Sequence, residues 1–254
     1  MIDDTVRSMS FGTMARDYDR FRIGPPPKIV DLVIPGPAET VLDLGAGTGA
    51  MTRLLVERIA EVHAVDPDPR MRAVLTGNCP AAIVHEGTAE DIPLPATSVD
   101  AVVMASAWHW VEPARAIPEI ARVLRPSGTL GLLWNRRDAS VPWISDFEEF
   151  RVSVTGGDNR VVEAIDYYLE EPWLPAGSPF TDIEISSLPW SAQMTREDLV
   201  GLLTTYTGYL LAPEDRKPQL LREFADYIDR DERLGTGDTV EVPMRCAYWR
   251  ARRV

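Results

Sequence analysis

The sequence is poor in the residues that build metal sites and disulfides. Its 254 residues include two cysteines, Cys79 and Cys246, and three histidines, His63, His85 and His109. Two cysteines without a CxxC pair exclude a disulfide scaffold and a four-cysteine zinc site. The histidines show no HExxH or His-x-His spacing, so we expect no bound metal.

Basic residues are also in the minority, with 26 Lys and Arg against 39 Asp and Glu, a net charge of −13. Binding to a phosphate backbone needs a basic face, so we expect no nucleic-acid partner. Residues 138–235 carry 20 acidic and 8 basic side chains, which is a net −12. This excess is typical of a solvated acidic surface, or it marks a separate structural layer.

Long apolar runs are missing as well. The longest stretches, such as residues 101–105, have the length of a strand and fall far short of the ~20 residues that a membrane span requires. The first residues lack the basic and apolar regions of a signal peptide. We therefore expect a cytoplasmic protein without a membrane segment.

Short apolar strands alternate with helical patterns through the first half of the chain. The strands are expected at 41–44, 62–66, 82–85, 99–105 and 129–134. Such alternation predicts parallel βαβ units, and hence a Rossmann-like α/β sheet.

The pattern changes after Asn135. We expect two late strands at 182–194 and 238–252 that pair antiparallel at one edge of the sheet. Residues 138–181 and 195–236 are interpreted as inserted lid segments over the carboxyl ends of the strands. With an N-terminal helical cap at 9–35 and a cofactor-binding core at 36–137, they would form one domain over residues 1–254.

A glycine-rich turn, Gly45-Ala-Gly-Thr-Gly49, follows the first strand. Glycines allow a backbone to approach a ligand closely, and the following helix presents free N–H groups. Asp43 precedes the turn and would repel a pyrophosphate, but it could attract an ammonium group. Asp66 ends the second strand, where a carboxylate can accept hydrogen bonds from two ribose hydroxyls. S-Adenosylmethionine combines an ammonium, a carboxylate and a ribose without a phosphate.

The segment from Val41 to Gly49 resembles the first motif of class I S-adenosylmethionine-dependent methyltransferases. Further segments at the expected separations are similar to the family's ribose motif, adenine segment, fourth strand and RVLxPGG turn: residues 63–67, 86–93, 98–103 and 122–128. Residues 10–22, the prolines at 25–27 and Trp108-His-Trp110 are similar to the methyltransferase type-11 and trans-aconitate-methyltransferase-like group.

The resemblance implies methyl transfer from S-adenosylmethionine, with S-adenosylhomocysteine as the product. It implies cofactor contacts from the glycine turn and its acid, from the ribose carboxylate, from side chains packed on the adenine and from the adenine segment: Asp43, Gly45, Ala46, Gly47, Asp66, Pro67, Met71, Thr88, Ala89 and Glu90. In the N-terminal segment, Tyr18 and Arg22 could close over the cofactor, with Arg22 pairing with its carboxylate.

Several polar and aromatic residues are candidates for contacts with the methyl acceptor. His109 is either a general base or a histidine packed between its tryptophan neighbours. The aromatic candidates for a pocket wall are Trp108, Trp110, Trp134, Tyr206 and Tyr209, with plain core packing as the alternative. Arg136 and Arg137 could bind a carboxylate acceptor. The acidic lid and the tryptophans favour a neutral, partly apolar acceptor, and a base at His109 predicts a pH limb near ~6.5.

We therefore expect methyl transfer to the hydroxyl or carboxylate of a small molecule, by direct in-line displacement, in a monomer or a homodimer. Three alternatives remain open at this point. A non-catalytic protein could bind S-adenosylmethionine or S-adenosylhomocysteine, a methyltransferase could act on a macromolecule, or a nicotinamide dehydrogenase could use the same fold. The position of Asp43 argues against the last of these.

Overall fold

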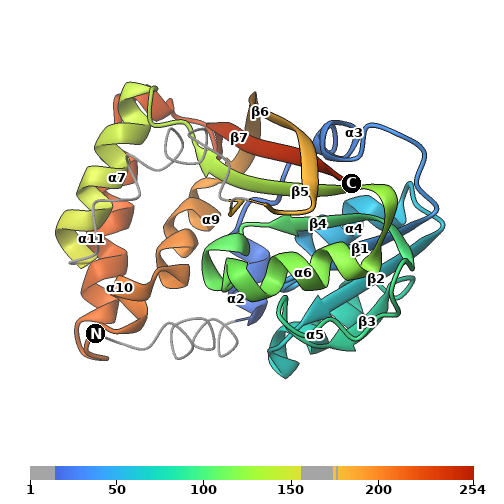
Figure 1. Cartoon of the computed structure of the whole chain (residues 1–254). Coiled ribbons are helices and arrows are strands. Elements are labelled where there is room, and N and C mark those ends of the chain that lie inside the picture. Colours follow the sequence, from blue (N-terminus) through green and yellow to red (C-terminus); the bar gives the residue numbers. More distant parts are fainter. Residues whose placement is uncertain (1–14, 156–173, 176) are drawn as a thin grey trace.

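A seven-stranded mixed sheet forms the centre of the molecule, in the order β3-β2-β1-β4-β5-β7-β6 (Figure 1). The computed structural model describes residues 15–155, 174–175 and 177–254. Neighbouring strands from β3 to β5 are parallel, whereas β7 pairs antiparallel with both β5 and β6. The predicted α/β class, with a mostly parallel sheet and an antiparallel edge, is confirmed.

The strands are β1 Thr40–Leu44, β2 Glu61–Asp66, β3 Ile83–Glu86, β4 Val99–Ala105, β5 Leu124–Arg137, β6 Phe180–Thr195 and β7 Thr239–Arg253. The first four agree with the sequence pattern to within one residue. The fifth begins five residues earlier than expected, because Leu124 already pairs with Val99 of β4. The predicted turn at 125–128 is an irregularity within the strand, where Ser127 has a φ of 63°. Strands β6 and β7 cover the two segments expected at the antiparallel edge.

The helices are α2 Ala15–Phe21, α3 Ile29–Val33, α4 Ala50–Val56, α5 Pro69–Asn78, α6 Pro113–Val123, α7 Pro142–Thr155, α9 Arg196–Gly201, α10 Thr207–Leu210 and α11 Lys217–Arg230. The described residues also include the short 3-10 turns η2 Trp108–Trp110, η4 Leu202–Thr205 and η5 Glu232–Leu234.

Helices cover both faces of the sheet and bury separate apolar clusters. On one face, Val33 of α3 and Leu55 of α4 pack with Val41 of β1. On the other face, Ile120 of α6 packs in a cluster that includes Trp249 of β7. This double covering makes the parallel strands apolar on both sides, which is why they appear in the sequence as short continuous apolar runs.

The far ends of β6 and β7 carry a helical layer of their own. Met194 and Val242 pack there with Phe147 of α7 and Phe224 of α11, whose rings meet edge to face at 5.2 Å. We call α7, α9, α10 and α11 the lid helices. Figure 1 shows α7 and α11 side by side, beyond the ends of β5 and β7. Residues 156–173 and 176 of the expected lid lie outside the described residues.

Helix α2 lies between the lid helices and the sheet layer (Figure 1). Arg20 forms ion pairs with Glu197 and Asp198 at the start of α9, and Asp19 forms one with Arg53 of α4. The N-terminal segment therefore contacts both layers. Residues 9–14 of the expected cap lie outside the described residues.

Within the described ranges, no helix has the length and apolar character that a membrane span needs. In the same ranges, no group of three or more His, Cys, Asp or Glu side chains is arranged to hold a metal ion.

Candidate functional site

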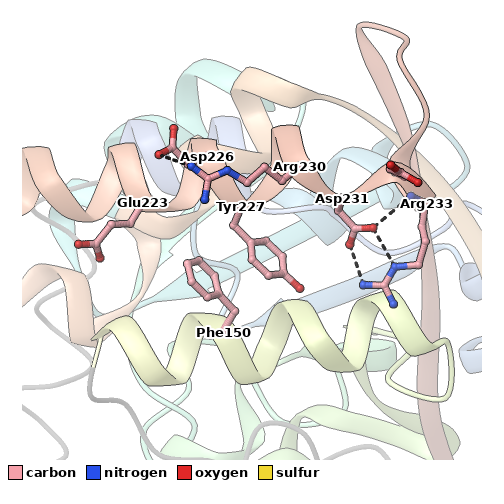
Figure 2. Close-up of a pocket in the computed structure, with 8 residues that line it drawn as sticks. Phe150, Glu223, Asp226, Tyr227, Arg230, Asp231 and Arg233 are labelled. Carbon is pink, nitrogen blue, oxygen red and sulfur yellow. Dashed lines mark hydrogen bonds and ion pairs between the residues drawn. The ribbon is translucent and has the colours of Figure 1, made fainter.

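Two hollows in the surface of the described structure are candidates for a site. One is an open groove between α7 and α11, where the rings of Phe150 and Tyr227 stack at 4.2 Å (Figure 2). Its arginines pair with its own acids, Arg230 with Asp226 and Arg233 with Asp231. Such pairing is typical of a solvated surface, so the groove offers no obvious chemistry.

The other hollow is a cavity of about 520 Å³ at the carboxyl ends of β1, β2, β4 and β5. Parallel α/β sheets bind their ligands at this edge. Its wall contains the glycine turn, the end of β2, the adenine segment and the N-terminal segment. The fold thus brings together most of the residues that the sequence indicated for a cofactor.

The glycine turn needs its glycines for conformation and for space. Gly45, Gly47 and Gly49 have φ angles of 73°, 57° and 91°, in the left-handed region that side chains rarely adopt. A Cβ on Gly45 would lie 2.6 Å from the Cβ of Ala107, whereas a Cβ on Gly47 would enter open space. Gly45, Ala46 and Gly47 all line the cavity, so ligand atoms can approach this backbone closely.

Asp66 lines the cavity and supports the turn. Its Oδ2 accepts a hydrogen bond from the N–H of Gly47 at 2.8 Å, and its Oδ1 accepts one from the N–H of Asp68 at 2.9 Å. Each carboxylate oxygen has a second lone pair, which suits a ribose hydroxyl. Burial raises the pKa of Asp66.

Asp43 lies beneath the glycine turn and is fully buried, outside the cavity wall. Its Oδ2 accepts a hydrogen bond from Thr52 Oγ1 at 2.6 Å, and its Oδ1 has no hydrogen-bond partner among the described residues. Burial raises the pKa of Asp43 to about 7, and the charge of Asp66 acts in the same direction. A buried carboxylate with an unused oxygen fits a nearby cationic ligand group, here an ammonium.

The expected adenine contacts Pro67, Met71, Thr88, Ala89 and Glu90 all line the cavity. Within this group Glu90 already accepts a hydrogen bond at Oε1 from the N–H of Glu112, at 2.8 Å. One of its two carboxylate oxygens is thus held by the protein. Together with the open glycine turn and Asp66, these residues fit S-adenosylmethionine.

Tyr18 and Arg22 line the cavity from the N-terminal side. The Nε of Arg22 donates to Thr205 Oγ1 at 2.9 Å, its Nη2 donates to Thr205 O at 3.1 Å, and its guanidinium lies 4.5 Å from the ring of Tyr206. Arg22 was expected to pair with a cofactor carboxylate. In this structure Arg22 also joins the cavity wall to the lid.

His109, Trp110 and Arg136 form the wall beyond the ends of β4 and β5. The rings of His109 and Trp110 lie 4.6 Å apart. Desolvation between the cavity walls lowers the pKa of His109 to about 4, and the charge of Arg136 adds to the shift. His109 is an exposed residue of this wall, and with its lowered pKa it is neutral at pH 7. The expected limb near pH 6.5 is therefore displaced to lower pH.

The other expected acceptor tryptophans lie elsewhere. Trp108 and Trp134 are buried in the core on the α6 face, where Trp108 meets Trp249 edge to face at 6.1 Å. The cause is local: the 3-10 turn η2 directs Trp108 inward and leaves Trp110 38% exposed. The expectation that Trp108 and Trp134 line the cavity is therefore wrong, because both side chains belong to the core.

Tyr206, Tyr209 and Arg137 also lie away from the cavity. Both tyrosines are buried in the core of the lid helices. Arg137 forms an ion pair with Glu148 and donates to the Tyr206 hydroxyl. Because side chains alternate along β5, Arg136 faces the cavity while Arg137 faces the lid. None of the described lid residues lines the cavity.

Sequence reasoning missed three residues that shape the site. Thr52 holds Asp43, Ala107 packs against the glycine turn, and Asn135 lines the cavity at the end of β5. Only Asn135 carried a signal, since a polar residue directly after a predicted parallel strand lies at the ligand edge.

Comparisons with known proteins agree with this geometry. Residues 42–132 match the family model described as a methyltransferase domain. An uncharacterized methyltransferase of Mycobacterium bovis is 39% identical over 236 residues, 93% of this chain and 92% of the relative. An uncharacterized methyltransferase-like protein of Schizosaccharomyces pombe is 32% identical over 240 residues, 92% of this chain and 91% of the relative.

Solved structures share the fold. A putative type II methyltransferase from Anaeromyxobacter dehalogenans aligns with a TM-score of 0.67 and 24% identity, covering 92% of this chain and 98% of that one. An N-methyltransferase of Haemonchus contortus, solved with S-adenosylhomocysteine, aligns with a TM-score of 0.52 and 18% identity, covering 99% of this chain and 59% of that one.

Proposed function

The chain belongs to the S-adenosylmethionine-dependent methyltransferases, and from that premise we propose that it methylates an oxygen of a small molecule, an acceptor that is anionic or ionises beside Arg136. The observation that carries this proposal is that Arg136 and a neutral His109 both lie in one wall of the cavity.

The dimensions of the site favour a small acceptor. A cavity of about 520 Å³ must hold the cofactor and the acceptor together. Its walls come from the glycine turn, the ends of the strands and the N-terminal segment, so the reacting atoms would be enclosed. Enclosure excludes competing water and holds the nucleophile in line with the bond that breaks.

The charge near His109 favours an anionic acceptor over a neutral one. The expectation of a neutral acceptor rested on an acidic lid and three tryptophans, but no described lid residue lines the cavity and two of the tryptophans belong to the core. Arg136 remains, and a guanidinium binds carboxylates and stabilises oxyanions.

The bound cofactor supplies an electrophilic methyl group on a sulfonium. An acceptor oxygen forms the new C–O bond as the C–S bond breaks, and the electron pair returns to sulfur. A carboxylate needs no proton transfer. A hydroxyl gives its proton to neutral His109, while Arg136 stabilises the developing negative charge.

The test is a radiolabelled methyl-transfer screen of small carboxylic acids and phenols, each paired with its neutral amide or ether. We expect transfer to the acids or phenols alone. Arg136→Met should raise the KM of the best acceptor by about tenfold or more, as loss of a charged hydrogen bond requires, without changing the affinity for S-adenosylhomocysteine. An unchanged KM contradicts the role of Arg136.

The pH–rate profile separates the two acceptor types. With a hydroxyl acceptor, wild type should keep its rate from pH 8 down to below pH 6.5, because the pKa of His109 is lowered, and His109→Gln should be slow throughout. With a carboxylate acceptor the two proteins should have the same profile. Binding of the cofactor without transfer to any acceptor would favour a non-catalytic binding protein.

A further inference from the structure

Part of the cavity wall has no regular secondary structure to hold it. Ile23, Gly24 and Pro25 follow the end of α2 and lie outside any helix or strand, yet all three line the cavity. A reaction that depends on alignment requires a fixed wall. We propose that Asn135 is the positioning residue that fixes this wall over the bound cofactor; the inference rests on the function proposed above.

The side chain of Asn135 bonds to two segments that are distant in sequence. Its Nδ2 donates to Ile23 O at 3.0 Å and to Gly24 O at 2.8 Å. Its Oδ1 accepts a hydrogen bond from Trp190 Nε1 of β6 at 3.0 Å. One carboxamide therefore connects the N-terminal wall, the end of β5 and the edge strand.

The chemistry of the three partners fixes the orientation of the amide. Oxygen and nitrogen of an asparagine side chain are assigned from their hydrogen bonds. Here the partners on one side are carbonyl oxygens, which can only accept, and the partner on the other side is an indole N–H, which can only donate. In the reversed orientation the amide NH2 would face the indole N–H of Trp190, and the amide oxygen would face the two carbonyl oxygens. Only one orientation is therefore compatible with the site.

These bonds also use both hydrogens of Nδ2, which leaves it no donor for a ligand. Asn135 lines the cavity but acts through the backbone of Ile23 and Gly24. Its own backbone lies in the ladder between β5 and β7, opposite Cys246. A side chain on a paired strand is a rigid support for a wall segment that has none of its own.

Arg22 holds the same segment from the other side. Its bonds to Thr205 attach the start of the wall to the lid, whereas Asn135 attaches the next two residues to the sheet. Losing the Asn135 attachment should therefore free the wall at Ile23 and Gly24 while α2 stays in contact with the lid.

The test uses Asn135→Asp, which keeps the shape but replaces the donor by an oxygen that repels both carbonyls. We expect the Kd of S-adenosylhomocysteine to rise by about tenfold or more, because two wall carbonyls lose their hydrogen-bond donor. Amide exchange at residues 22–24 should become faster in the ligand-free protein. Trp190→Phe keeps the two Nδ2 bonds, so we expect a smaller rise in Kd.

Asp100→Ala is the matched control. Asp100 accepts hydrogen bonds from the N–H groups of Glu39 and Thr40 at the opposite end of the sheet. The Asp100→Ala variant should have a lower melting temperature and an unchanged Kd for S-adenosylhomocysteine. The inference is overturned if Asn135→Asp leaves the Kd and the exchange at residues 22–24 unchanged, or if Asp100→Ala changes them as much as Asn135→Asp does. If the wild type binds S-adenosylhomocysteine but methylates no acceptor, only the proposed function is contradicted. The role of Asn135 is still tested, because the Kd of S-adenosylhomocysteine and the amide exchange do not depend on methyl transfer.

Discussion

At the scale of single residues, Asp43 beneath the glycine turn is an unusual carboxyl group, because it is fully buried with no cation beside it among the described residues. Asp43 is fully buried with one bound oxygen and one without a partner among the described residues. A buried carboxylate without a cation resists ionisation, which raises its pKa from 3.8 to about 7. The protonation state of Asp43 therefore changes within the physiological pH range.

The raised pKa has two consequences of definite sign. The folded protein binds a proton at Asp43 that the unfolded chain releases near pH 4, so this group stabilises the fold below pH 4. That contribution to the free energy of unfolding disappears as the pH rises to about 7. A cationic cofactor prefers the ionised form, so its affinity should fall as the pH drops below about 7.

Thr52→Val tests this reading of Asp43. The substitution removes the hydroxyl that stabilises the ionised carboxylate, so the pKa should rise further and the loss of cofactor affinity should begin at higher pH. Calorimetric titration of S-adenosylmethionine from pH 5.5 to 8.5 measures the midpoint. Thr76→Val, which removes an exposed hydroxyl bonded to Arg72 O, is the control. Equal midpoints in the two variants would contradict the assignment.

At the scale of elements, the contact between β5 and the lid helices depends on one buried acid. Glu148 of α7 forms ion pairs with Arg137 of β5 and with Arg151, and all three side chains are at most 10% exposed. The guanidinium of Arg151 lies 4.2 Å from the ring of Tyr206. Burial opposes the ionisation of Glu148, but the two arginines outweigh it, so its pKa is lowered.

Glu148→Gln should therefore be strongly destabilising, because it leaves two buried guanidinium groups without a counter-charge. We expect a loss of about 3–5 kcal/mol in the free energy of unfolding, measured by urea denaturation. The neighbouring Glu149 is exposed, so Glu149→Gln should change stability by less than about 0.5 kcal/mol. Similar losses in both variants would show that Glu148 is not the central group of the cluster.

At the scale of the whole molecule, the N-terminal segment joins the two layers. Arg20 and Arg22 contact the lid, Asp19 contacts α4, and Ile23 and Gly24 bind to Asn135 of the sheet. The lid helices have a core of their own and contribute no described residue to the cavity. We therefore expect ligand binding to affect the N-terminal segment before the lid helices.

Hydrogen exchange with and without S-adenosylmethionine measures this directly. We expect slower exchange at 18–24 and 45–48, since most of these residues line the cavity, and unchanged exchange in the centres of α7 and α11. The amides of α6, which contributes no residue to the cavity wall, serve as the internal reference. Comparable slowing in α7 and α11 would indicate closure of the whole lid, as the sequence had suggested.

Local sequence patterns were enough to predict those parts of the fold that depend on short segments. The alternation of apolar strands and helices predicted the parallel sheet to within one residue for β1 to β4. The glycine turn and Asp66 predicted the cofactor edge, because the conformations that glycine allows and the ends of parallel strands are properties of short segments. The two late strands were predicted as well, since β7 alternates polar and apolar residues.

The direction in which several individual side chains face depends on tertiary packing and was not predicted from the sequence. Trp108 and Trp110 are two residues apart, yet a 3-10 turn buries one and exposes the other. Arg136 and Arg137 are neighbours, yet the alternation of β5 sends one to the cavity and the other to Glu148. Asn135 acquires its partners from residues 55 and more positions away. Composition and spacing do not encode such contacts, because they arise only when distant segments pack together.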